Sequence, residues 1–160
     1  MIRAAVGPRL GSQPVVVLEP KALYRRLGAA LPTDGSVDET ALHAARRARA
    51  GSDLTLIAWG AAVPVAIDAA ERMTADGFEV GVIDLRALVP LDVATLVEAV
   101  RETGRALVVS DGAGAFAGAV AAEVMREAFL SLEAPIGLVS SDDEDWVARV
   151  REAALATLEF

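Results

Sequence analysis

The feature that most restricts the fold is a strand–helix–strand pattern within residues 51–92. Residues 54–59 and 79–85 are short apolar runs of strand length. Between them, residues 62–75 carry apolar side chains at helical spacing, and Asp76-Gly77 follows as a helix stop. Two strands joined through a helix form a βαβ unit with a right-handed crossover. The run therefore predicts neighbouring parallel strands covered by a helix.

The same alternation continues toward the C-terminus. It predicts a helix over residues 93–102, a strand over 105–110, a helix over 116–130 and a strand over 135–140. Asp92 is well placed to cap the first of these helices. An alternation of this kind predicts an α/β fold of three layers, with helices on both faces of a mostly parallel sheet. A ligand of such a sheet would lie beyond the carboxyl ends of its strands.

The last predicted element is a helix near the C-terminus. Residues 141–144 read Ser-Asp-Asp-Glu, which matches a capping box that starts a helix. Val147, Val150, Ala154 and Leu158 then follow at helical spacing. The acidic residues suit the positive end of this helix, and they lack the spaced ligands and the glycine of a calcium loop.

Composition restricts the chemistry. The chain has 160 residues, enough for one domain, and is 54% hydrophobic but only 4% aromatic, which indicates an aliphatic core. It contains no cysteine, so disulfides, thiolate metal sites and a cysteine nucleophile are excluded. With His43 as its one histidine, a site of several histidines is excluded too. No signal-peptide pattern and no run of membrane-spanning length is present, which favours a cytoplasmic protein.

The charge is unevenly distributed along the chain. The net charge is -8, and most of the acidic excess lies after residue 50. An acidic surface repels phosphate backbones, so nucleic acid is not an expected partner. Two interpretations remain: the acidic residues only keep the protein soluble, or they form a surface that receives a basic partner.

The chain offers no clear catalytic constellation. Residues 112–117 fit the dinucleotide pattern G-x-G-x-x-G/A, but they follow a late strand and lack an acidic residue at the next strand end. A tight turn of small residues is the simpler interpretation. Ser110 and Asp111 stand side by side without a convincing histidine partner. We therefore predict no catalytic, cofactor-binding or metal-binding residues.

Several consecutive motifs carry a family resemblance. They are LEPKALYR at residues 18–25, GSDLTLIAWG at 51–60, VIDLRALVPLDVATL at 82–96 and ETGRALVV at 102–109. In this order and spacing they resemble the C-terminal domain of the β subunit of thiamine-diphosphate-dependent 2-oxoacid dehydrogenases, a domain shared more distantly with transketolase. The segment FLSLEAPI at 129–136 resembles the branched-chain type more than the pyruvate type.

The resemblance also implies a fold and a domain division. In the family this domain is a five-stranded mixed sheet whose first strand is antiparallel. Residues 42–49 should therefore be a strand, although the sequence ALHAARRARA at 41–50 has helical propensity. Residues 1–40 resemble the end of the pyrimidine-binding domain and a linker, and residues 41–160 the transketolase C-terminal-like domain.

Function is implied by the same resemblance. The chain should be a C-terminal assembly domain that is not catalytic alone, because nearly all of the pyrimidine-binding domain is missing. Thiamine diphosphate and magnesium belong to the complete family enzyme, whose α subunit binds the diphosphate and the metal. Implied partners are a second copy of the chain, the α subunit and the lipoyl acyltransferase. The candidate docking residues for a basic partner are Asp142, Asp143, Glu144, Asp145 and Phe160.

The sequence departs from the family at one point of interest. Ser110, Asp111 and Gly112 stand where the family usually has His-Glu-Ala. This leaves an alternative open, in which the chain is a stand-alone α/β module that binds a small anionic ligand at the carboxyl ends of its strands.

Overall fold

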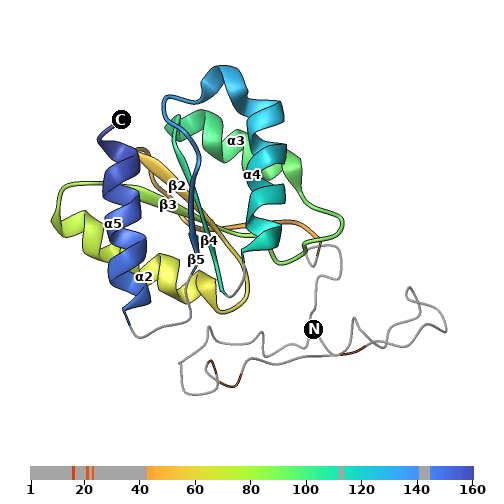
Figure 1. Cartoon of the computed structure of the whole chain (residues 1–160), viewed down its shortest axis with the longest axis horizontal. Coiled ribbons are helices and arrows are strands. Elements are labelled where there is room, and N and C mark those ends of the chain that lie inside the picture. Colours follow the sequence, from red (N-terminus) through yellow and green to blue (C-terminus); the bar gives the residue numbers. More distant parts are fainter. Residues whose placement is uncertain (1–15, 17–20, 22, 24–42, 112–113, 141–144) are drawn as a thin grey trace, which may run out of the picture.

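The computed structural model describes residues 43–111, 114–140 and 145–160, together with Val16, Lys21 and Leu23. Strands and helices alternate through these residues (Figure 1). The strands are β1 (Arg46–Arg49), β2 (Leu54–Ala58), β3 (Val80–Asp84), β4 (Ala106–Ser110) and β5 (Gly137–Ser140). The helices are α2 (Ala62–Ala75), α3 (Val93–Thr103), α4 (Ala115–Ala128), the 3₁₀ turn η4 (Phe129–Ser131) and α5 (Trp146–Leu158).

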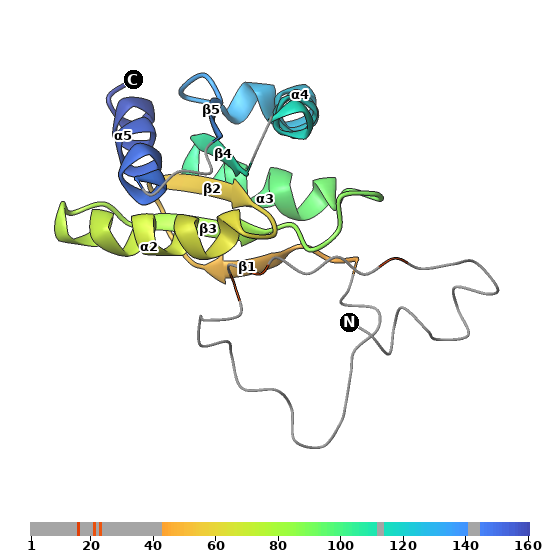
Figure 2. The same ribbon diagram turned by 60° about the horizontal axis from the view of Figure 1, so that its bottom comes forward.

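The five strands form one mixed sheet in the order β1-β3-β2-β4-β5. β1 is antiparallel to β3, and every other pair is parallel. Helices α2 and α5 cover one face of the sheet, and α3 and α4 cover the other (Figure 2). The prediction of a three-layer α/β fold with an antiparallel first strand is therefore confirmed.

Two aliphatic clusters, one on each face, hold the layers together. β2 and β4 are buried along their whole length, as expected for strands covered by helices on both faces. On one face their side chains pack against Ala66, Ala70 and Met73 of α2 and Val150 of α5. On the other face they pack against the apolar stripes of α3 and α4. The aliphatic composition of the sequence follows from this double coverage.

β1 is a strand although its residues favour a helix. Its three arginines are fixed by long-range contacts rather than by neighbours along the chain. Arg46 lies 3.3 Å from Asp84, and Arg47 lies 2.5 Å from Glu102 on α3. Arg49 donates to the backbone carbonyl of Val80. Pairing with β3 and these contacts override the local propensity.

Asp92 connects β1 to the start of α3. Its carboxylate accepts hydrogen bonds from the backbone N–H of Thr95 at 3.2 Å, from the Thr95 hydroxyl at 2.7 Å and from the Ala45 N–H at 3.0 Å. Burial alone would raise the pKa of Asp92, but these hydrogen bonds lower it below its ordinary value. The stabilisation is therefore present above the unfolded-state pKa of about 3.9 and is lost as pH falls through the lower folded-state pKa. The predicted cap is confirmed.

Helix α5 is the last helix of the described residues. It starts at Trp146, and its N-cap Asp145 makes no side-chain capping hydrogen bond. The predicted capping box at residues 141–144 lies outside the described residues. The predicted inner face is largely confirmed: Val150 and Ala154 are fully buried, and Val147 and Leu158 pack against the core.

Candidate functional site

The carboxyl ends of the four parallel strands meet at one edge of the sheet. Three residues just beyond these ends adopt a left-handed backbone: Gly60 after β2 (φ 54°), Arg86 after β3 (φ 54°) and Gly114 after β4 (φ 58°). Trp59 packs edge-on against Phe116 at the start of α4, with ring centroids 5.7 Å apart. This is the edge where the fold would place a ligand.

Ser110 lies at the centre of this edge, at the end of β4. It is fully buried, and within the described part of the chain its hydroxyl has no hydrogen-bond partner. A Cβ placed on Gly114 would lie 3.9 Å from the Ser110 hydroxyl and 3.6 Å from that of Ser140. Gly114 is the N-cap of α4 and no side chain caps this helix. Within the dinucleotide-like pattern, Gly114 therefore caps α4 and residues 115–117 belong to the helix, while residues 112–113 lie outside the described residues.

Among the described residues, this edge lacks the partners that nucleophilic catalysis needs. His43 precedes β1, which is separated from β4 by β3 and β2, a distance of about 14 Å at ordinary strand spacing. Asp111 is exposed beside Ser110. The structure therefore does not bring the one histidine to Ser110, and the described residues form no nucleophile–base–orienter set.

Asp84 and Arg86 set the shape of the loop after β3. The Asp84 carboxylate accepts from the Arg86 backbone N–H at 3.3 Å and from the Arg46 side chain at the same distance. The Leu85 N–H donates to the carbonyl of Ala58 at 2.9 Å and keeps the loop against β2. These contacts hold the loop after β3 against the sheet.

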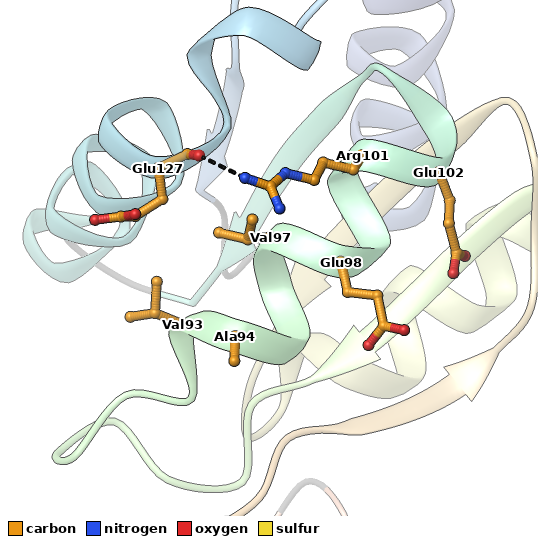
Figure 3. A pocket seen from close by; sticks show the side chains of 7 residues that line it. All are labelled: Val93, Ala94, Val97, Glu98, Arg101, Glu102 and Glu127. Atoms are coloured by element: carbon orange, nitrogen blue, oxygen red, sulfur yellow. Dashed lines mark hydrogen bonds between the residues drawn. The ribbon is translucent and has the colours of Figure 1, made fainter.

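A recessed region lies between α3 and α4, the two helices on the face of the sheet opposite α2 and α5. It is an open groove of about 650 Å³, lined by Val93, Ala94, Val97, Glu98, Arg101, Glu102 and Glu127 (Figure 3). Arg101 reaches across it and donates to the backbone carbonyl of Glu127 at 3.3 Å. An apolar floor with three glutamates at its rim suits contact with a protein better than catalysis.

Ion pairs hold two of the three rim glutamates. Glu102 pairs with Arg47 at 2.5 Å; this hydrogen bond lowers the pKa of Glu102 and raises that of Arg47. Glu127 pairs with Arg126 at 2.5 Å. Sequence reasoning did not find this groove, because Val93 and Ala94 on α3 meet Glu127 on α4 only through the packing of the two helices.

The structure separates two of the docking residues predicted from the sequence. Asp145 is exposed at the start of α5, and Phe160, 78% exposed, follows its other end. The helix has 13 residues, so the two lie about 20 Å apart. Asp142, Asp143 and Glu144 lie outside the described residues. Asp145 and Phe160 therefore belong to a single contact surface only if a partner spans the length of α5.

The described residues do not fit thiamine diphosphate with its magnesium ion. They contain no group of three histidine, cysteine, aspartate or glutamate residues that could hold a metal ion. The strand-end edge offers one buried hydroxyl, and beside it the exposed Asp111 would repel a diphosphate. A separate search of all the described residues finds no helix with the length and apolar character of a membrane span.

Comparison with known protein families decides the identity of the fold. Residues 43–156 match the model of the family described as "Transketolase, C-terminal domain". The chain belongs to this family. The matched residues include the whole sheet, helices α2, α3 and α4, η4 and all but the last two residues of α5. The transketolase C-terminal-like fold inferred from the sequence motifs is thereby confirmed.

Curated relatives agree with the motif-based assignment. The chain is 40% identical over 167 aligned residues to the pyruvate dehydrogenase E1 component subunit beta of Staphylococcus epidermidis, covering 93% of this chain and 50% of that protein. It is 42% identical over 137 residues to the corresponding subunit of Staphylococcus aureus, covering 82% and 41%. The chain thus spans about half the length of the curated relatives it matches.

Solved structures share the fold at lower identity. A split-gene transketolase, described as an inactive beta4 tetramer, is 24% identical with a TM-score of 0.58, covering 73% of this chain and 43% of that one. A transketolase of Pichia stipitis is 17% identical with a TM-score of 0.52, covering 79% and 19%. At these identities the likeness supports the fold alone.

Proposed function

We propose that the chain is the C-terminal assembly domain of the β subunit of a 2-oxoacid dehydrogenase. The observation that carries this proposal is the 40% identity across 93% of the chain to half of a pyruvate dehydrogenase β subunit. The aligned half contains the domain described above, whose described residues hold no catalytic set. The role left for such a domain is to position other parts of an enzyme.

The partners follow from the proposed role. The chain joins a second copy of itself, an α subunit and the lipoyl acyltransferase of the same complex, in the cytoplasm. Residues 1–40 contribute the end of a pyrimidine-binding domain and a linker, and residues 41–160 the assembly domain. Thiamine diphosphate and magnesium act in the complete enzyme, and this chain alone binds neither. The 2-oxoacid is of the branched-chain type suggested by residues 129–136, although the relatives reported above are pyruvate dehydrogenase subunits.

An acidic surface suits the acyltransferase contact. One described surface for such a partner is the α3–α4 groove, where Glu98, Glu102 and Glu127 lie beside an apolar floor. Because Glu102 and Glu127 are paired with Arg47 and Arg126, a basic partner would have to exchange these ion pairs for its own. Asp145, exposed at the start of α5, offers a second acidic contact, while Asp142, Asp143 and Glu144 lie outside the described residues. Both contacts would weaken as salt screens them, because the carboxylates are exposed to solvent.

The alternative, a stand-alone module for a small anion, is less well supported. The buried hydroxyl of Ser110 beside the N-terminus of α4 favours an anion. The exposed carboxylate of Asp111 next to it opposes one. The family match explains the whole domain, whereas the anion site would explain only its strand-end edge.

The isolated chain is expected to show no turnover of a 2-oxoacid and no binding of thiamine diphosphate. The reason is that its described residues form neither a metal site nor a nucleophile–base pair. Decarboxylation of 3-methyl-2-oxobutanoate and of pyruvate, assayed with added thiamine diphosphate and magnesium, checks the first part. Titration calorimetry with the cofactor checks the second. Turnover by the pure chain would contradict the proposal that it serves assembly.

A further inference from the structure

Exposed apolar side chains gather where α4 lies beside the edge strand β5. Among the described residues, Phe129 is 66% exposed, Leu138 54% and Met125 43%. Leu138 alternates with Val139, which packs toward α5, so Leu138 points to the face that α4 covers. β5 is the last strand of the sheet, with α4 and α5 on its two sides (Figure 2). Large exposed side chains grouped in this way mark an interaction surface.

A line of small and apolar residues runs along one flank of α4 to its C-terminal end. Gly118, Ala122 and Met125 lie in α4, and Phe129 is its C-cap residue and the first residue of η4; we name these four the α4 stripe. Intervals of four and three residues keep the three α4 members on one side of the helix, and Phe129 follows four residues later at its C-terminal end. Glu127, which lines the groove toward α3, lies about half a turn around the helix from them. The stripe therefore faces away from α3, on the side of β5.

The described residues give no explanation for Gly118. It is in the interior of α4, where glycine weakens a helix relative to alanine. Its φ is not left-handed, and a Cβ added to it would meet nothing within 4 Å. Neither its backbone conformation nor packing against the described residues therefore requires a glycine here. Close approach of another backbone is a common reason for a glycine in such a place.

We propose that the α4 stripe is the contact with a second copy of this chain, with the two α4 helices antiparallel. In an antiparallel pair, residues whose numbers have a constant sum face each other. The spacing of the stripe then sets Gly118 against Phe129 of the second copy and Ala122 against its Met125. Each small residue meets a large one, and the same pairs repeat across the two-fold axis. This self-complementarity selects a second copy over an unrelated partner.

Charge supports the same occupant. Each chain carries a net charge of -8, so two copies must meet through an uncharged surface. The stripe contains no ionisable residue. Its neighbour Arg126 pairs with Glu123 at 2.6 Å and with Glu127 at 2.5 Å within the same helix. The inference rests on the self-association included in the proposed function, and it specifies the face and the register of that contact.

Two matched arginine substitutions test the face. Ala122→Arg places a charge in the stripe, and Ala94→Arg places the same charge at an exposed alanine of α3, in the groove. Sedimentation velocity over a concentration series should show at least a tenfold rise in the dimer dissociation constant for Ala122→Arg. Ala94→Arg should change it less than twofold. Circular dichroism shows that each variant remains folded.

A third substitution separates contact from folding. Gly118→Ala should raise the thermal midpoint of the dilute monomer, because alanine favours a helix and meets open space. It should also raise the dimer dissociation constant severalfold, since the added methyl keeps the two helices apart. A purely structural glycine would not give these opposite effects.

The remaining outcomes separate this inference from the proposed function. A dimer that Ala122→Arg leaves intact, or that Ala94→Arg abolishes instead, overturns the α4 contact and leaves self-association standing. A chain that is monomeric at every concentration overturns self-association itself. Because the chain has no cysteine, mixing Ala122→Cys and Met125→Cys chains under oxidising conditions adds a direct readout. The antiparallel register predicts mixed disulfide dimers in excess of either homodimer.

Discussion

Gly51→Ala is expected to destabilise the domain by about 3 kcal/mol or more, at the upper end of the cost of overpacking. A Cβ on Gly51 would lie 2.0 Å from the backbone nitrogen of Gly81 and 2.3 Å from the carbonyl carbon of Val80. These are main-chain atoms of β3, so no flexible side chain can move aside. The loop is also held there by hydrogen bonds from the N–H groups of Ser52 and Asp53 to the Glu79 carbonyl, at 2.8 and 3.0 Å.

Urea unfolding followed by circular dichroism measures this effect. Gly118→Ala is the matched control, because its added methyl meets open space and the helix gains propensity. At protein concentrations where the chain is monomeric, the control should be slightly more stable than the parent. If Gly51→Ala changed the free energy of unfolding by less than about 0.5 kcal/mol, the close approach of this loop to β3 would be wrong.

Leu107→Ala is expected to lower the free energy of unfolding by about 2–5 kcal/mol, the range for deleting a buried leucine side chain. Leu107 is fully buried in β4 and belongs to the cluster beneath α2 and α5. Gly137 on the neighbouring strand β5 leaves space for the Leu107 side chain, because a Cβ on Gly137 would lie only 2.7 Å from the Leu107 Cδ1. Removal of the side chain leaves a cavity. β4 cannot easily move to close it, because helices cover both faces of this strand.

Leu130→Ala is the control for this second prediction. Leu130 is 97% exposed in η4, so its truncation should change the free energy of unfolding by no more than about 0.5 kcal/mol. Denaturant midpoints of the two variants, compared at equal slope, give the difference directly. Similar values for both leucines would contradict the central place of β4 in the core.

Elements determined by local pattern could be predicted from the sequence. Helix α2 has the bounds that the apolar spacing and the Asp76-Gly77 stop indicate. Asp92 caps α3, and Gly104 ends it with a left-handed backbone. In these places the residues that decide the structure lie within one turn of the helix end, so the sequence contains the whole cause.

Elements determined by distant contacts could not be predicted from local pattern. Residues 41–50 have helical composition, and only the family resemblance indicated the strand. Its causes are Asp84 and Glu102, which lie far along the chain from the arginines of β1. Trp146, the first residue of α5, packs in the core through contacts with distant residues; the capping box predicted just before it lies outside the described residues.

The candidate surfaces show the same division. The sequence indicated that Ser110 ends a strand at the functional edge, but not that its hydroxyl would be buried without a partner. The α3–α4 groove was invisible because it forms between two helices. Gly118 was a usable sequence signal, because a glycine inside a predicted helix lowers the stability of that helix and so needs an explanation. The structure adds that, among the described residues, a Cβ on Gly118 would meet open space.

The most direct test of the account is to purify the chain from its native cells under mild conditions and identify what accompanies it. Size-exclusion chromatography followed by mass spectrometry is the measurement. The proposed assembly role predicts that the α subunit of a 2-oxoacid dehydrogenase co-elutes with the chain in a fixed ratio. A variant that removes the charges of the α3–α4 groove should leave this association unchanged. Elution of the chain free of any such subunit, at physiological salt and concentration, would contradict the role proposed for this domain.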